Sequence, residues 1–251
     1  MARSLSAIAL ACLLVAGPGC QALESGNPIG SLIEPLMPPK PREVAADLFN
    51  ISDADKRRRS VALLTSASFG GEEAYVRAAC VNGLGLHGET EDVPVILLRL
   101  TDRVAFVRWE AAKALQKIHD PQAITPLINA MMRDEDADVR QAAATALGQY
   151  ATPGVFDALV GALDDSNFSV VHAAGESLRL LTGQDLGDDG GAWLAWSRDN
   201  RSNLFAQRQT YVWQPYVKPP GMMDKVQFWK DRPTPSPRTP VGMSDEESGA
   251  L

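Results

Sequence analysis

Small and apolar side chains recur at helical spacing in four stretches of this sequence. Each stretch begins with a valine, continues through a run rich in alanine, and reaches a leucine eight residues after the valine. Spacings of three, four, seven and eight residues place such side chains on one face of an α-helix. The intervals between successive stretches are 31, 32 and 31 residues, and the stretches begin at Val76, Val107, Val139 and Val170.

A second apolar phrase repeats in step with the first. It begins at Val93, Ile124 and Val155, 31 residues apart each time. Two phrases with one period indicate a repeated pair of helices, and neither helix of a pair can bury its stripe without neighbours. The sequence therefore predicts an all-α fold, a short α-solenoid of about four helical hairpins within residues 43–182. A helix near residues 55–66 is expected as an N-terminal cap.

Polar and special residues fall at the expected helix ends. Gly85 and Gly148 stand where a helix should stop, and Pro94 and Pro126 lie near a first turn, where a missing N–H costs little. Three arginines directly follow the repeat valine in three successive repeats. We expect each to pair with a capping aspartate of the adjacent repeat; the alternative is a binding role. The arginines are Arg77, Arg108 and Arg140, and the aspartates are Asp102, Asp134, Asp136 and Asp165.

The repeated pattern of Asp, Val-Arg, Ala-Ala and Ala-Leu-Gly resembles the HEAT-like repeats of phycobilin lyase subunits. The resemblance covers about residues 53–182 and implies the solenoid fold, whereas it implies little about function. It also implies that the second helix of each hairpin lines the concave face.

Two series of positions on these second helices lie outside the apolar stripe, and we expect them to form a continuous strip that binds a partner. Trp109 is the candidate apolar anchor, because an exposed tryptophan that a partner buries often dominates the binding energy. The alternative is that Trp109 packs on a neighbouring hairpin. The candidate contact residues are Trp109, Gln141, His172, Asn82, Lys113, Thr145 and Glu176.

The charge balance restricts the class of partner. The net charge is −7, which argues against nucleic acid and against attachment to anionic lipid through a basic patch. Residues 43–182 contain 20 Asp and Glu against 13 Lys and Arg, so a basic or neutral protein or peptide is favoured. No small-molecule substrate is predicted.

The sequence offers little for catalysis. His87, His119 and His172 have no helical i,i+3 or i,i+4 spacing, and the His-Glu pairs that hold iron in the similar deoxyhypusine hydroxylase fold are missing. Cys80 stands among repeat alanines, which indicates a small core residue. We therefore expect a non-catalytic protein without a metal or cofactor.

The N-terminus has the layout of an export signal. Arg3 precedes 12 uncharged residues, Leu5 to Ala16, and Gly17-Pro18-Gly19 leads to Cys20. The run is too short to span a bilayer, which needs about 20 residues. A cysteine after small residues resembles a bacterial lipoprotein signal over residues 1–20, in which Cys20 would be lipidated, although Gly17 stands where that family usually has leucine. The alternative is ordinary cleavage and secretion, with cleavage after Ala22.

The lipoprotein resemblance also implies a location. Gln21 follows the cysteine, where an aspartate would retain such a protein at the inner membrane, so the periplasmic side of the outer membrane is expected. Residues 21–42 contain five prolines and are expected to form an extended linker.

The repeat period ends near Thr182. Residues 183–231 contain Trp193, Trp196 and further aromatic residues. We expect a short helix over the end of the last hairpin. An aromatic strap should follow it across the repeats, and its path could lie along the groove. Residues 232–251 have the composition of a disordered tail. The favoured function is a protein-interaction scaffold of the bacterial cell envelope. The alternatives are a purely structural envelope lipoprotein and an accessory subunit that positions a catalytic partner.

Overall fold

The computed structural model describes residues 53–65, 74–215 and 235–244. These residues belong to one compact unit, Pro41–Leu251. The expected signal segment, Cys20 and the proline-rich linker lie outside the described residues. The regular elements of the described part are helices, and its β-pairing consists of two isolated bridges.

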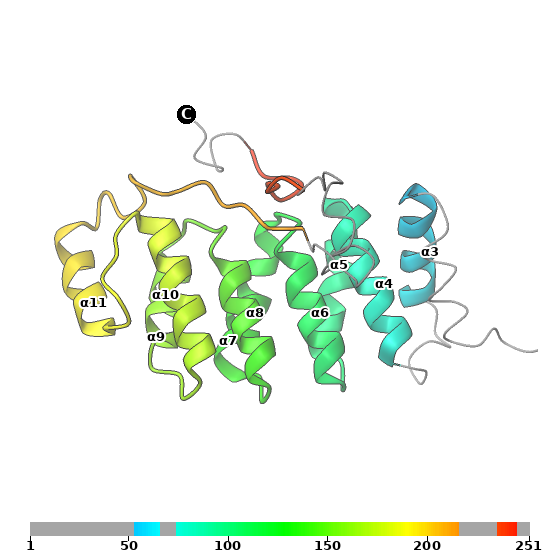
Figure 1. Ribbon diagram of the computed structural model, residues 1–251, viewed down its shortest axis with the longest axis horizontal. Helices are drawn as coiled ribbons and strands as arrows, with labels where there is room; N and C mark the ends of the chain where they lie inside the picture. The colour runs from blue at the N-terminus through cyan, green and yellow to red at the C-terminus, as the bar shows by residue number, and fades with distance from the viewer. Residues whose placement is uncertain (1–52, 66–73, 216–234, 245–251) are drawn as a thin grey trace, which may run out of the picture. The chain divides into compact units, whose positions relative to one another are not determined.

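The helices form consecutive hairpins, as the repeat predicted (Figure 1). Within each hairpin the two helices pack against each other, and each second helix also packs against the second helix of the next hairpin. The four second helices therefore lie side by side in one layer, called the second-helix layer below (Figure 1). The hairpins are α3 (Asp53–Thr65) with α4 (Ala74–His87), α5 (Val93–Leu97) with α6 (Ala105–Leu115), α7 (Ile124–Arg133) with α8 (Ala137–Leu147), and α9 (Pro153–Ala162) with α10 (Phe168–Thr182).

The helix expected as an N-terminal cap is α3. It packs against α4, so it is the first helix of the first hairpin. It also covers the end of the stack. Short 3-10 turns extend the first helices: Thr90–Asp92 and Leu98–Thr101 flank α5, and Pro121–Ala123 precedes α7.

The repeated alanines and leucines make the core. Ala111, Ala143 and Ala174 are fully buried, as are Leu115 and Leu147. Alanine in this stripe lets backbones of neighbouring helices come close, and the leucine then fills the remaining space. Cys80 is buried at the equivalent position in α4, which confirms its reading as a small core residue.

Of the two glycines expected at helix ends, Gly148 ends a helix and Gly85 does not. Gly85 does not end a helix, since α4 continues to His87. A Cβ at Gly85 would lie 2.8 Å from the Cα of Ala114 on α6, so the glycine permits close approach of the two helices. Gly148 does cap α8, but in a right-handed conformation, and a Cβ there would meet Ser177 Oγ at 2.8 Å. Helix termination by a left-handed glycine occurs at Gly183, where φ is 71°.

The arginine ladder joins each repeat to the next, which confirms its expected structural role. Each guanidinium donates to both carboxylate oxygens of one aspartate, and that aspartate also accepts a backbone N–H at the start of the following helix. Such bidentate bonds are geometrically demanding and strong. The pairs, with their Nε–Oδ2 distances, are Arg77–Asp102 at 2.7 Å, Arg108–Asp134 at 2.7 Å and Arg140–Asp165 at 2.8 Å.

Beyond the repeats, α11 (Gly190–Asp199) packs on α9. Trp193 is buried, stands edge-on to Phe156, and donates its indole N–H to the carbonyl of Gly187 at 2.8 Å. The tryptophan thus closes the apolar end of the last hairpin.

Residues 201–215 then run back along the carboxyl ends of the second helices, the orange segment in Figure 1. Gln209 N–H donates to the carbonyl of Leu180 at 2.7 Å, and the buried Tyr211 hydroxyl donates to the carbonyl of Thr145 at 3.1 Å. Trp213 lies beside Lys117, whose ammonium is 5.3 Å from the ring centroid.

Residues 235–244, part of the segment 232–251 expected as a disordered tail, make specific backbone contacts. Trp213 and Arg238 exchange two backbone hydrogen bonds, and Val241 N–H donates to the carbonyl of Lys117 at 2.8 Å. Pro240 is buried. These backbone bonds give a polar, proline-rich segment a fixed place that its composition did not indicate.

Candidate functional site

The seven candidate contact residues all lie on the second-helix layer. Asn82 is on α4, Trp109 and Lys113 on α6, Gln141 and Thr145 on α8, and His172 and Glu176 on α10.

Contacts bring three of the seven together, on α4 and α6. Asn82 Nδ2 donates to Glu110 Oε2 at 3.0 Å, and Lys113 Nζ lies 3.7 Å from Glu110 Oε1. The same ammonium is 3.8 Å from the centroid of the Trp109 ring. Glu110 thus links Asn82 to Lys113, and Lys113 in turn covers one face of Trp109.

The other four make contacts elsewhere. His172 stacks on Phe168 and Glu176 pairs with Arg179, both within α10. Thr145 bonds back to the carbonyl of Gln141 and gives its own carbonyl to Tyr211. The structure therefore separates a dense group on α4 and α6 from more isolated positions on α8 and α10.

The contacts of Trp109 are with the core and with residues of its own helix, α6. It is half-buried against the core and stacks on Phe106 with 5.7 Å between ring centroids. Phe106 in turn lies 6.1 Å from Tyr75 across the α4–α6 boundary. Tyr75, Phe106 and Trp109 are called the aromatic cluster below. Tyr75 is 75% exposed and Phe106 is 43% exposed.

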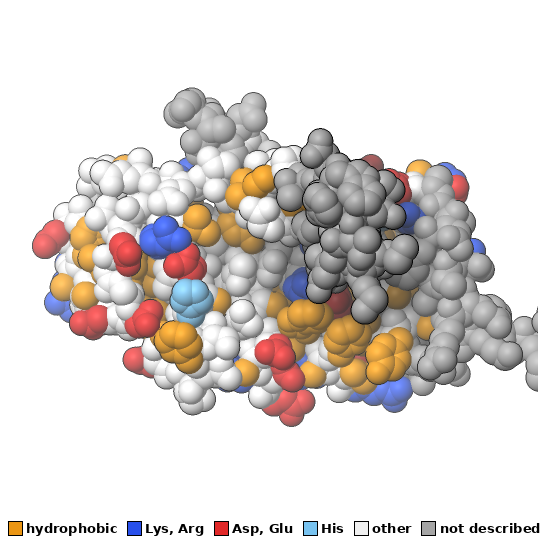
Figure 2. Space-filling model, in the orientation of Figure 1, with side chains coloured by type: hydrophobic (Ala, Val, Ile, Leu, Met, Phe, Trp, Pro, Cys, Tyr) orange, Lys and Arg blue, Asp and Glu red, His pale blue; other side chains and the backbone are white. Residues whose placement is uncertain are grey.

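Sequence reasoning missed Tyr75, Phe106 and Glu110. A signal was available, because Tyr75 and Phe106 each directly precede the repeat valine and are 31 residues apart, whereas the later repeats have Asp138 and Ser169 there. Aromatic residues at one repeat position in adjacent repeats predict neighbouring rings on one surface. Figure 2 shows hydrophobic side chains gathered over the lower parts of α4 and α6 in this view.

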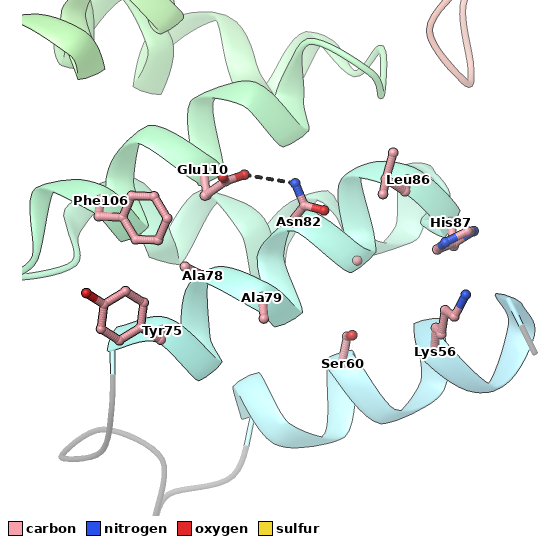
Figure 3. Close-up of a pocket in the computed structure, with 11 residues that line it drawn as sticks. Lys56, Ser60, Tyr75, Ala78, Ala79, Asn82, Leu86, His87, Phe106 and Glu110 are labelled. Carbon is pink, nitrogen blue, oxygen red and sulfur yellow. Dashed lines mark hydrogen bonds between the residues drawn. The ribbon is translucent and has the colours of Figure 1, made fainter. Parts of the chain in front are cut away.

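A pocket of about 370 Å³ adjoins the aromatic cluster between α3, α4 and α6. Tyr75 and Phe106 stand at one end, Asn82 and Glu110 in the middle, and Lys56 and His87 at the other end (Figure 3). The remaining lining residues are small or aliphatic: Ala78, Ala79, Gly83 and Leu86, with Ser60 on α3.

Burial changes the acidity of groups near this region. Burial lowers the pKa of Lys117 to about 8, and the charge of Lys113 adds to the effect. Burial also lowers the pKa of His87, against the attraction of Asp53. The pKa of the Cys80 thiol is raised by burial to about 12, so this cysteine is a poor nucleophile at neutral pH.

The C-terminal segment and the aromatic cluster lie at opposite ends of α6. Phe106 is in the first turn of the helix, whereas Trp213 and Val241 meet the chain at Lys117, after its last turn. Eleven residues of helix correspond to about 16 Å. The described parts of the C-terminal segment therefore contact the second-helix layer away from the cluster; residues 216–229, also expected in the strap, lie outside the described residues.

Metal-binding groups and membrane-spanning helices are both missing from the described residues. Within the described residues, no group of three or more His, Cys, Asp or Glu side chains is placed to hold a metal ion. No helix in that same part of the chain is long and apolar enough to cross a membrane.

The chain is similar to a solved structure and matches a family model. A crystal structure of an engineered protein is 19% identical, with a TM-score of 0.41, over 72% of this chain and 94% of that one. Comparison with curated proteins gives no match. The family model for HEAT repeats matches residues 61–132 and 124–188, which together span residues 61–188 of the 251. The chain therefore belongs to the HEAT repeat family.

Proposed function

We propose that this protein is a non-catalytic scaffold that binds a protein or peptide partner on its second-helix layer, centred on the aromatic cluster. HEAT repeats in general mediate protein–protein interaction. The observation that carries the proposal here is the pair of exposed rings, Tyr75 and Phe106, beside a pocket of about 370 Å³. Rigid aromatic side chains next to a pocket favour partner binding, because they lose little entropy and desolvate a large area.

Trp109 and Lys113 support the same surface from within. Their cation–π contact, together with the Glu110–Asn82 bond, orders the wall of the pocket before a partner arrives. A preorganised wall reduces the entropy lost on binding. Gln141, Thr145, His172 and Glu176 would extend the contact along α8 and α10.

Photo-crosslinking in intact cells tests this proposal. Phe106 is replaced by p-benzoylphenylalanine, and Leu98, which is 64% exposed on the other side of the same hairpin, is replaced as a matched control. We expect a discrete crosslinked partner from position 106 that is missing from position 98 and is weakened by Trp109→Ala. Identical products from both positions, or no intermolecular product from 106, would contradict the proposal.

The structural alternative predicts a different result of the same experiment. If the surface is filled by the protein's own C-terminal segment, mass spectrometry will find position 106 joined to residues of the same chain. A partner that appears only after truncation beyond residue 203 would then indicate self-occlusion. A product whose partner is an enzyme would favour the accessory-subunit alternative.

We further propose that the scaffold is exported to the cell envelope and anchored by a lipid on Cys20, on the periplasmic side of the outer membrane. The support is the sequence of residues 1–20. Cys20→Ser should move the protein from the detergent phase to the aqueous phase in a phase-partition experiment. Unchanged partition would show that Cys20 carries no anchor, and simple secretion would then be the better explanation.

A further inference from the structure

Glu110 breaks the repeat pattern at a buried position. Three residues after the repeat valine, the other second helices have Ala79, Ala142 and Ala173, whereas α6 has Glu110. Its residue is 8% exposed. A carboxylate at a position built for alanine is costly to desolvate unless it is well compensated. Departures from local rules of this kind are expected at functional sites.

The compensation of Glu110 is weaker than that of the aspartates in the arginine ladder. Asp102, Asp134 and Asp165 each receive two short bonds from one guanidinium, with donor–acceptor distances between 2.7 and 3.0 Å.

Glu110 instead accepts a neutral amide bond from Asn82 at 3.0 Å. The ammonium of Lys113 is 3.7 Å away and lies over the Trp109 ring. In the described part of the chain, no arginine pairs with Glu110. Among the described residues, three aspartates each receive two bonds from one guanidinium, and the buried Asp92 receives one from Arg57 Nε at 2.6 Å, whereas the buried Glu110 has no arginine partner.

The surroundings of Glu110 suit a guanidinium. The Tyr75 and Phe106 rings stand at the neighbouring end of the pocket, and both are accessible (Figure 3). Arginine stacks on aromatic faces and at the same time donates paired hydrogen bonds to a carboxylate. Within the same group, Lys113 on Trp109 already shows a cation held by a ring face.

We propose that this pocket receives an arginine side chain of the partner peptide, with its guanidinium stacked against the exposed rings of Tyr75 and Phe106 and hydrogen-bonded to Glu110. The aliphatic part of the side chain would lie on Ala78 and Ala79. This inference rests on the proposed function and names the chemistry of the partner. The excess of acidic residues in 43–182, 20 against 13 basic, favours a basic partner in the same sense.

The opposite end of the pocket sets the direction. Lys56 and His87 stand there (Figure 3), with Lys56 Nζ 3.2 Å from Asp53. Neither side chain offers a carboxylate to a cation, and Glu110 is the acidic residue among those that line the pocket, so the arginine is directed towards Glu110. A neutral or acidic residue of the peptide would face Lys56.

Titration with two nearly isosteric probes tests the inference. N-acetylarginine amide and N-acetylcitrulline amide are added to the purified full chain, and binding is followed by NMR through the Asn82 side-chain amide and the backbone amides of α4 and α6. We expect the arginine probe to bind and the neutral citrulline probe to bind about tenfold more weakly or not at all, because it lacks the charge.

Two variants locate the effect. Glu110→Gln, which keeps the shape and the bond to Asn82, should weaken the arginine probe about tenfold, and Tyr75→Ala should also weaken it. Asp157→Asn, which removes an exposed carboxylate on α9, outside the second-helix layer, should leave binding unchanged. Thermal unfolding of each variant shows whether the fold is intact.

Three results would overturn the inference: equal binding of the two probes, arginine binding that survives Glu110→Gln, or no binding of the arginine probe up to its solubility limit. Failure here is distinguishable from failure of the proposed function. A partner crosslinked at position 106 in cells whose capture does not depend on Glu110 would preserve the interaction surface and reject the arginine.

Discussion

At the scale of single residues, the charged side chains of the arginine ladder differ from Glu110 in how far the sequence predicts their contacts. The arginine ladder could be predicted, because its arginines and aspartates share the repeat period and therefore meet in every interface. The environment of Glu110 could not be predicted in the same way. The sequence shows a glutamate at a position where other repeats have alanine, but its burial and its contacts with Asn82 and Lys113 depend on the packing of α4 against α6.

Lys117 carries a pH-dependent cost. Its pKa falls from 10.5 to about 8, chiefly because of burial. Between these values the unfolded chain binds more protons than the folded chain, so stability rises with pH across that window, and below about 8 the full cost of the buried charge is present. Lys117→Met should therefore raise the free energy of unfolding at pH 7 by about 1–3 kcal/mol.

Denaturant unfolding of wild type and Lys117→Met at pH 7 and near pH 10.5 checks this prediction. The advantage of the variant should shrink as the pH rises, since the wild-type amine becomes neutral in both states. Arg58→Met is the control, because an exposed guanidinium stays charged throughout. A constant difference across the range would mean that Lys117 does not titrate with the fold.

At the scale of helices, close approach governs the second-helix layer. Glycine at position 85 permits the α4 backbone to meet Ala114 on α6. The equivalent positions of the other repeats are Gln116, Gly148 and Arg179, so the repeat does not specify a small residue there, and a glycine suits both a helix end and a close contact. The distinction required the neighbouring helix.

Alanine substitution of two glycines tests this explanation, because the two changes in the free energy of unfolding should have opposite signs. Gly85→Ala should destabilise the fold by about 1–3 kcal/mol, because the added methyl group would overlap backbone atoms that cannot move freely. Gly154→Ala, near the start of α9 with nothing within 4 Å of its Cβ, should stabilise by about 0.5–1 kcal/mol, since alanine favours the helix. Chemical denaturation measures both. The close-contact explanation is wrong if Gly85→Ala is also stabilising.

At the scale of the whole described unit, each hairpin contacts chiefly its neighbours, so the ends limit stability. The C-terminal end depends on Trp193, which is 1% exposed and packs on Phe156. The segment after α11 adds backbone bonds to α10, α8 and the α6 end through Gln209, Tyr211 and Val241.

Loss of the Trp193 side chain should therefore act locally before it acts globally. Trp193→Ala is expected to cost about 3–5 kcal/mol, and hydrogen exchange should accelerate in α9 and α10 more than in α4 and α6. Leu194→Ala, next in sequence and 44% exposed, should change exchange little. Uniform acceleration across all hairpins would show that the stack unfolds as one cooperative unit.

The repeat by itself determined the helical hairpins, their number, the buried stripe and the arginine ladder, because each depends on a period that is visible along one chain. The tertiary structure decided what the period does not encode. It brought Tyr75 of one repeat against Phe106 of the next, buried Glu110 beside them, and placed residues 235–244 on the end of α6 through backbone bonds. These features occur where the repeats differ from one another. The sequence period does not predict them, because they depend on contacts between side chains of separate helices that form only when the helices pack.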